Sequence, residues 1–369
     1  MRPPSPPVGA GNPARPPDVR THVSVRRWVF VVLSFAAALG AAAYIARSAV
    51  PTGEIPVRLA WWAHAVAATA MALEIGLRAL KVSLAGAALG VPFGLWTALR
   101  MSLGGDFGAA ITPSRTGAEP ARFLVLAEAG LRPAGILLVL FAELFLESVS
   151  LAIIAVVLLA TFGLDGRAPA SIAGLIGSYA VAVIGVGIGG WFLARRSASG
   201  PPPAWARALG LHAGRWRAVQ RALRSLRDGI DGLRHARLGL MAGSLAASVG
   251  HIAVRLVILP VIVAGLGAGD VELDRLLTWP LVLLHGGAAA PAPAGGGLIE
   301  IAFGAALKST IPGPIFGAAL LWWRTYTFYL YVPLGALAAG ATVLRAVRGR
   351  SREAPSATEA ALRAARPAT

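Results

Sequence analysis

Apolar stretches of roughly 20 residues recur along the chain, and they limit what it can fold into more than any other feature. A helix needs about 20 apolar residues to cross the hydrocarbon core of a bilayer. With 56% hydrophobic and only 14% charged residues, the chain supplies several such stretches. The sequence therefore predicts an all-α fold, a polytopic helical membrane bundle. About six full spans are expected, at residues 28–46, 59–84, 134–162, 171–193, 238–266 and 314–344.

Two further segments, 112–122 and 291–300, interrupt apolar sequence with Pro and Gly at the same spacing. The matching positions are Pro113, Gly117 and Glu119 in the first segment and Pro293, Gly297 and Glu300 in the second. Pro and Gly break helices, and broken backbone at membrane depth survives only where protein or a water-filled cavity satisfies it. Paired breaks of this kind point to the binding site of a transporter.

The segments that carry these breaks are too short or too interrupted to be plain spans. We therefore expect residues 91–130 and 275–311 to form two broken, re-entrant helical hairpins. The first would enter from the inner side of the membrane and the second from the outer side. Opposite entry is the geometry of an inverted repeat, so our hypothesis is that the two halves of the chain are related in this way.

Basic residues predict how the bundle sits in the membrane. The formal net charge is +17, and Arg gathers beside the spans, which favours the cytoplasmic side and an anionic leaflet. We expect a multi-pass protein of the cytoplasmic (inner) membrane with both termini in the cytoplasm. Its parts are a disordered tail (1–25), a first transmembrane half (26–194), a basic amphipathic linker (195–237), a second half (238–346) and a disordered tail (347–369).

Two of these basic segments have a second interpretation. Residues 24–30 are similar to a twin-arginine export signal with cleavage near 41–43, although the later spans favour an uncleaved first span. The linker holds ten Arg and has apolar residues at helical spacing, which is typical of a helix lying on the membrane. Nucleic-acid binding is the alternative for the linker. We expect membrane lipids as its partner and no nucleic acid.

Two acidic residues, Glu143 and Glu147, lie one helical turn apart inside a predicted span. An ionised carboxylate at that depth costs roughly 2.5–3.5 kcal/mol. Both side chains should therefore face the bundle interior, with Arg115, Arg122 or Arg132 as partners.

Other ionisable residues in spans have competing interpretations. Glu74 and Arg78 are four residues apart and can pair on one helical face, or Arg78 can snorkel to the interface. His64, His251 and His285 are isolated in sequence, and we expect them to be packed or interfacial residues rather than ligands.

At these residues the chain resembles the transmembrane domain family of lysylphosphatidylglycerol synthase, whose members are also called flippase-like proteins. The resemblance covers about residues 55–345. The matching residues are Pro113, Arg115, Gly117, Glu119 and Arg122 in a first motif, Glu143 and Glu147 in the next helix, Pro291, Pro293, Gly295, Gly296 and Glu300 in a second motif, and Arg324, Tyr326, Pro333 and Gly335 in a last one.

Some positions depart from the family pattern. Ala290 and Ala292 stand where the family tends to have Thr, and Ile299 and Leu144 stand where it often has Arg. These changes make the expected site less polar and put the family's ligand in doubt.

The resemblance implies binding of a lipid head group and its movement between leaflets. Helix N-termini after the two breaks would present N–H groups to a phosphate, Arg side chains would add charge-assisted bonds, and carboxylates would recognise a cationic group or relay protons. The substrate-binding residues that we expect are Arg115, Gly117, Glu119, Arg122, Glu143, Glu147, Pro293, Gly297, Glu300 and Arg324.

Three other functions compete with lipid movement. The charges can be internal ion pairs that only hold the bundle together. The carboxylates can be the acid and base of a membrane-embedded transferase. The protein can also be a scaffold without transport. We expect no enzymatic activity, cofactor or metal, because the sequence has no Cys, no metal-ligand cluster and no aminoacyl-transfer domain after Arg352. A second copy of the chain, or an enzyme of lipid or envelope synthesis, is the expected protein partner.

Overall fold

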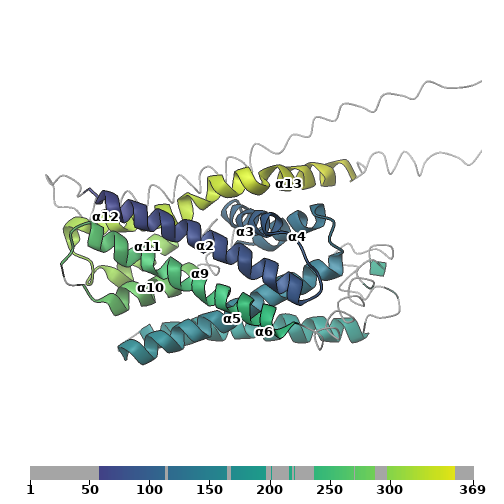
Figure 1. The fold of residues 1–369 in the computed structure, drawn as a ribbon, viewed down its shortest axis with the longest axis horizontal. Coiled ribbons are helices and arrows are strands. Elements are labelled where there is room, and N and C mark those ends of the chain that lie inside the picture. The colour runs from purple at the N-terminus through teal and green to yellow at the C-terminus, as the bar shows by residue number, and fades with distance from the viewer. Residues whose placement is uncertain are drawn as a thin grey trace, which may run out of the picture.

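The computed structural model describes residues 58–112, 115–163, 168–196, 201, 216, 217, 220, 237–269, 271–286 and 297–353. Within these ranges every regular element is a helix, as the sequence predicts (Figure 1). The predicted first span, the tail before it, Pro113, Pro293 and nearly all of the basic linker lie outside the described residues.

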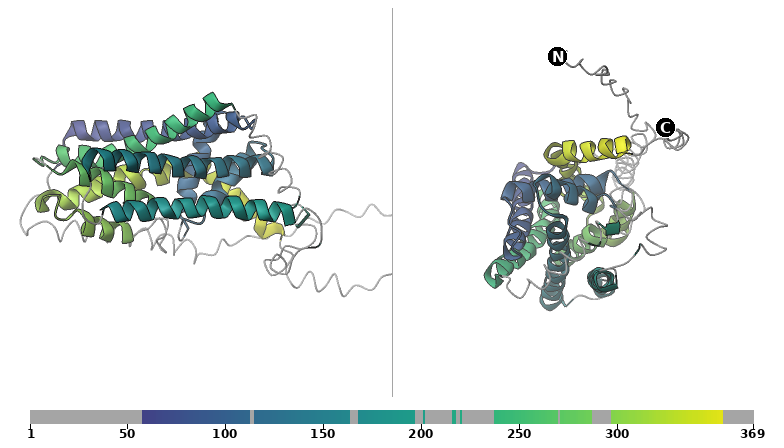
Figure 2. Two further views of the ribbon diagram at one scale, coloured as in Figure 1. Left: turned by 90° about the horizontal axis from the view of Figure 1, so that it is seen from below. Right: turned by 90° about the vertical axis from the view of Figure 1, so that its right-hand side faces the viewer.

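Four long helices run along the long axis of the molecule and form its frame (Figures 1 and 2). They are α2 (Trp61–Ala88), α5 (Pro133–Phe162), α6 (Ala168–Arg196) and α9 (Leu238–Gly265). At a rise of about 1.5 Å per residue, helices of this length exceed the roughly 30 Å of a hydrocarbon core. Among the described helices, α2 and α9 pack against each other most extensively, and α5 packs against both α6 and α9.

The frame is apolar outside and charged inside. Val156 on α5 is 63% exposed, whereas Lys81 on α2 is 1% exposed. By length and composition, two of the described helices, α5 and α9, are apolar enough to cross a membrane. The charged residues of α2 lower its hydropathy although they point inward. The count of six spans and the inverted repeat stay predictions.

The first interrupted segment folds as two short helices, α3 (Leu95–Ala110) and α4 (Ala118–Glu128), as its pattern predicts. The Thr112 hydroxyl joins them, because it donates to the Gly108 carbonyl at 2.8 Å and accepts from the Gly117 N–H at 2.7 Å. A Cβ on Gly117 would lie 2.7 Å from the Thr112 methyl group. Gly117 is therefore required for the close approach of the two helices.

The second interrupted segment lies around α10 (Leu273–Gly286) and α11 (Leu298–Leu307). Gly297 begins α11 with φ of 82°, in the left-handed region that favours glycine. Figure 1 places α10 and α11 toward one end of the long axis and α3 and α4 toward the other half.

The segment predicted as one last span is broken. It consists of α12 (Gly313–Arg324), a π-helical turn η3 (Thr325–Tyr329) and α13 (Tyr331–Glu353). Because α13 continues to Glu353, the boundary expected at residue 346 lies inside this helix. Small residues let α13 pack closely on α3: a Cβ on Gly104 would lie 2.7 Å from the Cβ of Ala339, a contact type that is common between membrane helices.

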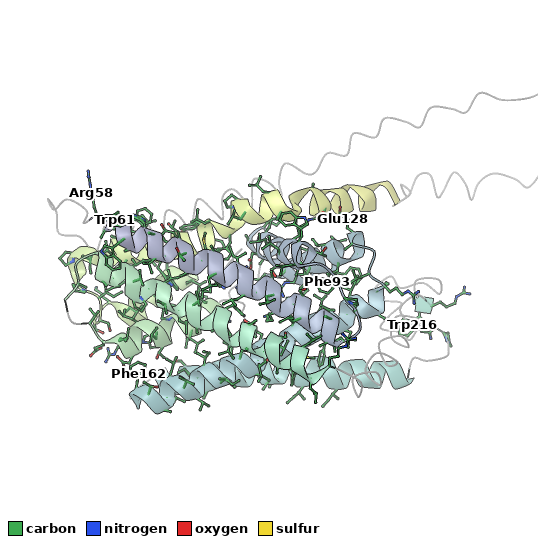
Figure 3. All side chains as sticks on the ribbon, viewed as in Figure 1. Arg58, Trp61, Phe93, Glu128, Phe162 and Trp216 are labelled. Carbon is green, nitrogen blue, oxygen red and sulfur yellow. The ribbon has the colours of Figure 1, made fainter. Side chains whose placement is uncertain are left out.

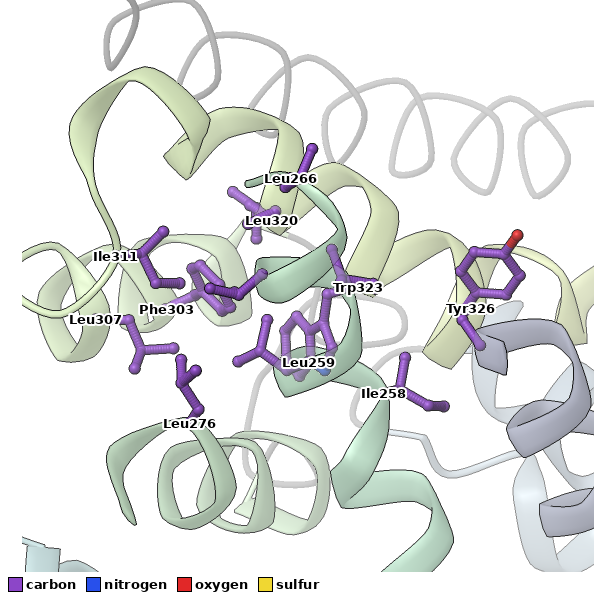
Figure 4. Close-up of a cluster of buried hydrophobic side chains, with 14 of the residues drawn as sticks. Ile258, Leu259, Leu266, Leu276, Phe303, Leu307, Ile311, Leu320, Trp323 and Tyr326 are labelled. Carbon is purple, nitrogen blue, oxygen red and sulfur yellow. The ribbon is translucent and has the colours of Figure 1, made fainter. Parts of the chain in front are cut away.

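Trp61 and Trp62 are exposed at the start of α2, at the same end of the molecule as Phe162 (Figure 3), in keeping with an interfacial belt. A buried cluster of aliphatic and aromatic side chains packs α9, α10, α11 and α12 together (Figure 4). In it, the rings of Phe303 and Trp323 lie 5.1 Å apart, which fixes α12 against α11 at the residue before Arg324.

Candidate functional site

A charged cavity of about 260 Å³ lies among α2, α3, α4, α5, α9 and α10. A water molecule needs only about 10–15 Å³ of such space, so the cavity can hold a larger ligand. Its ionisable lining residues are Arg78, Lys81, Arg115, Arg122 and Arg255, then Asp106, Glu119, Glu143 and Glu147, and finally His251 and His285. A second cavity of about 40 Å³ adjoins it, because both are lined by Asp106, Arg115, Arg255 and Leu284.

Arg78 connects α2 to α3 at the wall of the larger cavity. It donates to both carboxylate oxygens of Asp106, from Nη2 at 2.6 Å and from Nη1 at 3.1 Å. Its Nε also lies 3.6 Å from Glu74 Oε1. The predicted pair on one face of α2 is thus present, but Arg78 is buried and does not snorkel to the interface. Its closer partner, Asp106, is on another helix.

Lys81 connects α2 to α5. Its Nζ donates to Glu147 Oε2 at 2.7 Å and lies 3.9 Å from Glu143 Oε1. Both glutamates line the cavity, which confirms that they face the interior. Arg132, which we expected as a partner, is exposed at the N-terminus of the same helix. It lies about 16 Å from Glu143 along the helix axis, at about 1.5 Å per residue.

Arg122 on α4 connects the first break to α5. Its Nη1 lies 2.9 Å from Glu119 Oε1 and 3.2 Å from Glu143 Oε2. Arg122, one of the predicted partners of Glu143, thus forms an ion pair with it. The Glu119 side chain is 59% exposed, so one carboxylate of the cavity can be reached from outside the protein.

Two histidines that are isolated in the sequence gather at Glu147, and both are buried, as expected of packed residues. His251 Nε2 lies 3.2 Å from Glu147 Oε2, and its Nδ1 lies 3.7 Å from Glu74 Oε1. His285 Nδ1 lies 3.5 Å from Glu147 Oε1. The histidines come from α9 and α10, so their closeness to α5 is a product of helix packing.

Arg115 lies in the turn between α3 and α4 and lines both cavities. Its φ is 56°, and it is the non-glycine residue with positive φ among the described residues. A left-handed conformation costs a residue with a Cβ roughly 1–2 kcal/mol. Such strain occurs preferentially at functional sites.

A residue just after the second break, Glu300, forms a buried ion pair with Arg324. Glu300 Oε2 accepts from the Gly297 N–H at 2.8 Å, and Glu300 Oε1 lies 2.8 Å from Arg324 Nε. Arg324 lines the smaller cavity, and its guanidinium lies 4.4 Å from the centre of the Phe328 ring. Glu300 therefore lies behind Arg324 and holds it in place.

Arg255 lines both cavities, and Tyr331 lines the smaller one. Arg255 Nη2 donates to the Thr327 carbonyl in the π-helical turn at 2.7 Å. The Tyr331 hydroxyl donates to Glu74 Oε2 at 2.7 Å. Both Arg78 and Arg255 lie over the Tyr331 ring, at 5.5 and 5.3 Å. Turns of the π type are frequent at functional sites.

The cavities thus bring together most of the residues predicted from the two breaks. Arg115, Glu119, Arg122, Glu143, Glu147 and Arg324 line them; Gly117, Gly297 and Glu300 support them. Sequence reasoning missed a second set as site residues: Arg78, Lys81, Asp106, His251, Arg255 and His285. One signal for part of that set was available, because Glu74, Arg78 and Lys81 are spaced four and three residues apart, which places them on one helical face.

The ion pair of Arg100 and Glu128 lies apart from the cavities. Arg100 Nη2 on α3 lies 2.9 Å from Glu128 Oε2 at the end of α4. Both side chains are partly exposed, at 23% and 32%.

Comparison with protein families gives a match over most of the chain. A family model described as the lysylphosphatidylglycerol synthase TM region matches residues 28–335, a range that includes every residue of both cavities. No curated protein matches the chain.

Proposed function

Because the chain belongs to the family of lysylphosphatidylglycerol synthase transmembrane regions, we propose that it binds a lipid head group in the charged cavity and moves that lipid between leaflets. Because the family is a transmembrane region, the chain is a membrane protein. Its location in the cytoplasmic membrane, with residue 200 and the C-terminus inside, is part of the proposal.

The observation that carries the proposal is the cavity itself. Nine Asp, Glu, Lys and Arg side chains line a space of about 260 Å³ inside helices whose outer faces are apolar. Charged residues at that depth are costly. Ion pairs that only joined helices would serve best when packed against each other without such a space. A polar chamber beside an apolar surface suits a molecule with a polar head and apolar tails.

The distribution of charge favours a head group that carries a phosphate. The smaller cavity is lined by Arg115, Arg255 and Arg324 against one acidic residue, Asp106. The planar guanidinium group binds phosphate with two parallel hydrogen bonds. We therefore place the phosphate at these arginines.

The acidic residues of the larger cavity lie beyond that phosphate position. Glu119, Glu143 and Glu147 line this part of the chamber, and Glu119 is the most exposed of them. They suit the amine of a zwitterionic head group. A head group without an amine would leave their present partners, Arg122 and Lys81, in place. Zwitterionic and anionic phospholipids are thus the two ligand classes to test.

The test is transport of labelled phospholipid in liposomes that contain the purified protein. Dithionite bleaches fluorophores in the outer leaflet only, so in protein-free liposomes about half the signal survives. We expect the protein to expose inner-leaflet label of at least one class, zwitterionic or anionic. Bleaching that matches protein-free liposomes for both classes would reject lipid movement by this protein.

A further inference from the structure

One wall of the larger cavity is apolar, although most of the side chains that line it are ionisable. This wall includes Leu140 and Leu144 on α5 and Ala118 at the start of α4. Apolar side chains that face a water-filled chamber forgo the stabilisation that burial provides. A charged head group makes no use of them, so this wall suits an apolar group of the ligand.

The four α5 residues that line the cavity form two stripes along the helix. At about 100° per residue, the stripe of Leu140 and Leu144 is displaced by roughly 60° around the helix from the stripe of Glu143 and Glu147. Phe145, which is 49% exposed, lies about 100° beyond Leu144 in the same sense of rotation. The two leucines therefore lie between the acidic edge of the chamber and the outer surface of α5.

The hairpin of α4 and α5 is closed near the turn that joins the two helices. There Leu140 packs against a buried cluster that includes Val125 of α4 and Val139 of α5. Leu144 lies one helical turn further from the joining turn and is partly exposed. Within the described residues it packs against none of the buried hydrophobic clusters. The hairpin is thus less tightly packed at Leu144 than at Leu140.

The first turn of α4 lies beside this less packed part of α5. Arg122 Nη1 is 3.2 Å from Oε2 of Glu143, the residue before Leu144. Glu119, in the same turn of α4, has a side chain that is 59% exposed. The edge of the cavity at this point therefore has an exposed acid on one helix and an apolar side chain on the other.

We propose that the acyl chains of the bound lipid leave the larger cavity between the first turn of α4 and Leu144, over the wall formed by Leu140 and Leu144. The phosphate stays at the arginines of the smaller cavity, so this inference rests on the proposed function for the identity of the lipid. The occupant follows from the continuity of the apolar wall with the charged chamber. A lipid bound in this way keeps its head among charges and its chains in contact with apolar groups.

Photoreactive phospholipids with a diazirine in one acyl chain test this exit in liposomes that contain the full chain. Phosphatidylethanolamine and phosphatidic acid probes represent the zwitterionic and the anionic class, and mass spectrometry locates the label after illumination. We expect at least one of them to label Leu140 or Leu144. A diacylglycerol probe with the same chains should label these residues severalfold less, because it lacks the phosphate that the arginines hold. Equal labelling by phospholipid and diacylglycerol, or no label at either leucine, would overturn the proposal.

Val156 provides a control on the same helix. It is 63% exposed on the outer surface of α5 and does not line either cavity, so bulk lipid should reach it and all the probes should label it alike. In R115Q the phospholipid label should fall at Leu144 and stay unchanged at Val156. Loss of label at both positions would mean that R115Q is not inserted in the membrane, and the comparison of probes on the wild type then decides.

Narrowing the exit gives a second test that does not depend on labelling. L144W should slow the transport of labelled phospholipid severalfold, whereas V156W, on the outer surface, should leave it at the wild-type rate. Glycerol 3-phosphate has the phosphate but no chains, so it should bind L144W with the affinity of the wild type. Transport at the wild-type rate by folded L144W would contradict the exit.

These experiments separate the exit from the proposed function. If phospholipid is transported but neither leucine is labelled in preference to diacylglycerol, the exit is wrong and the proposed function stands. If the leucines are labelled preferentially by phospholipid but no lipid is transported, the proposed function fails and the exit stands as part of a lipid-binding site.

Discussion

Lys81 Nζ lies 2.7 Å from Glu147 Oε2, although the two residues are on different helices and 66 positions apart in the sequence. This pair fastens α2 to α5 across the charged cavity. Its lysine is almost fully buried, so little water reaches the charge if the pair is broken. The cavity therefore depends on pairing between helices at least as much as on the two breaks in the sequence.

Loss of one partner of this pair should destabilise the protein strongly. Replacing Lys81 with Met should lower the free energy of unfolding by about 3 kcal/mol, because a buried charge loses its partner. K81M/E147L should recover part of that loss. Unfolding in bicelles by SDS titration measures both. In the exposed Arg275–Glu272 pair, whose Nε and Oε2 lie 2.8 Å apart, R275M should lower it by only about 0–1 kcal/mol. Equal losses in K81M and R275M would contradict the central position of Lys81.

The conformation of Arg115 predicts that two substitutions that remove the same charge will differ in their effect on stability. Its φ of 56° suits glycine, so R115G should be more stable than R115A by roughly 1–2 kcal/mol. The difference between the two thermal unfolding curves isolates the backbone strain, because neither variant keeps the guanidinium. If R115A is as stable as R115G, the turn is not strained at this residue.

The close approach of α3 and α4 predicts that Gly117 tolerates no methyl group. In G117A the new Cβ would meet Thr112 at 2.7 Å, so we expect a loss of stability of roughly 1–3 kcal/mol, as for other overpacked sites. Gly174, on the outer α6, is the control, because a Cβ there meets nothing within 4 Å. G174A should be neutral or stabilising. A neutral G117A would show that the turn can rearrange.

The predicted membrane topology rests on the uneven distribution of Arg along the chain. It can be tested directly with introduced cysteines, since the chain has no Cys. Single cysteines at residue 200 and at the C-terminus should be inaccessible to a membrane-impermeant thiol reagent in intact cells, and accessible after lysis. Labelling of either position from outside would reject the predicted orientation and, with it, the opposite entry of the two broken segments.

Much of the fold could be predicted from the sequence, because local patterns of apolar residues, Pro and Gly indicate where membrane helices run and break. The Pro and Gly spacing predicted the break between α3 and α4, and the one-turn spacing of Glu143 and Glu147 predicted that both face inward. The π-helical turn at residues 325–329 was not predicted, because these residues include no Pro or Gly that would mark a break in a helix.

The partners of the charged residues could not be predicted, because they depend on how helices pack. Glu74 and Arg78 share a helix and were paired correctly, but Asp106 and Lys81 meet their partners across helix interfaces. Arg132 was one of the three expected partners, but it lies on the same helix as Glu143 at a different depth. If the two breaks line one central cavity, we expect Glu119 and Glu300 to approach each other near the midplane; crosslinking of cysteines placed at Ala118 and Ile299 tests this prediction.

The measurement that tests the central claim most directly is lipid movement by R115Q in the dithionite assay. Arg115 lines both cavities, and Gln keeps the backbone strain while removing the charge. Loss of a charge-assisted bond of about 1.5–3 kcal/mol predicts that R115Q moves labelled phospholipid roughly tenfold to a hundredfold more slowly than the wild type, while R100Q, outside the cavities, moves it at the wild-type rate. Wild-type transport by folded R115Q would contradict a head-group site at these arginines.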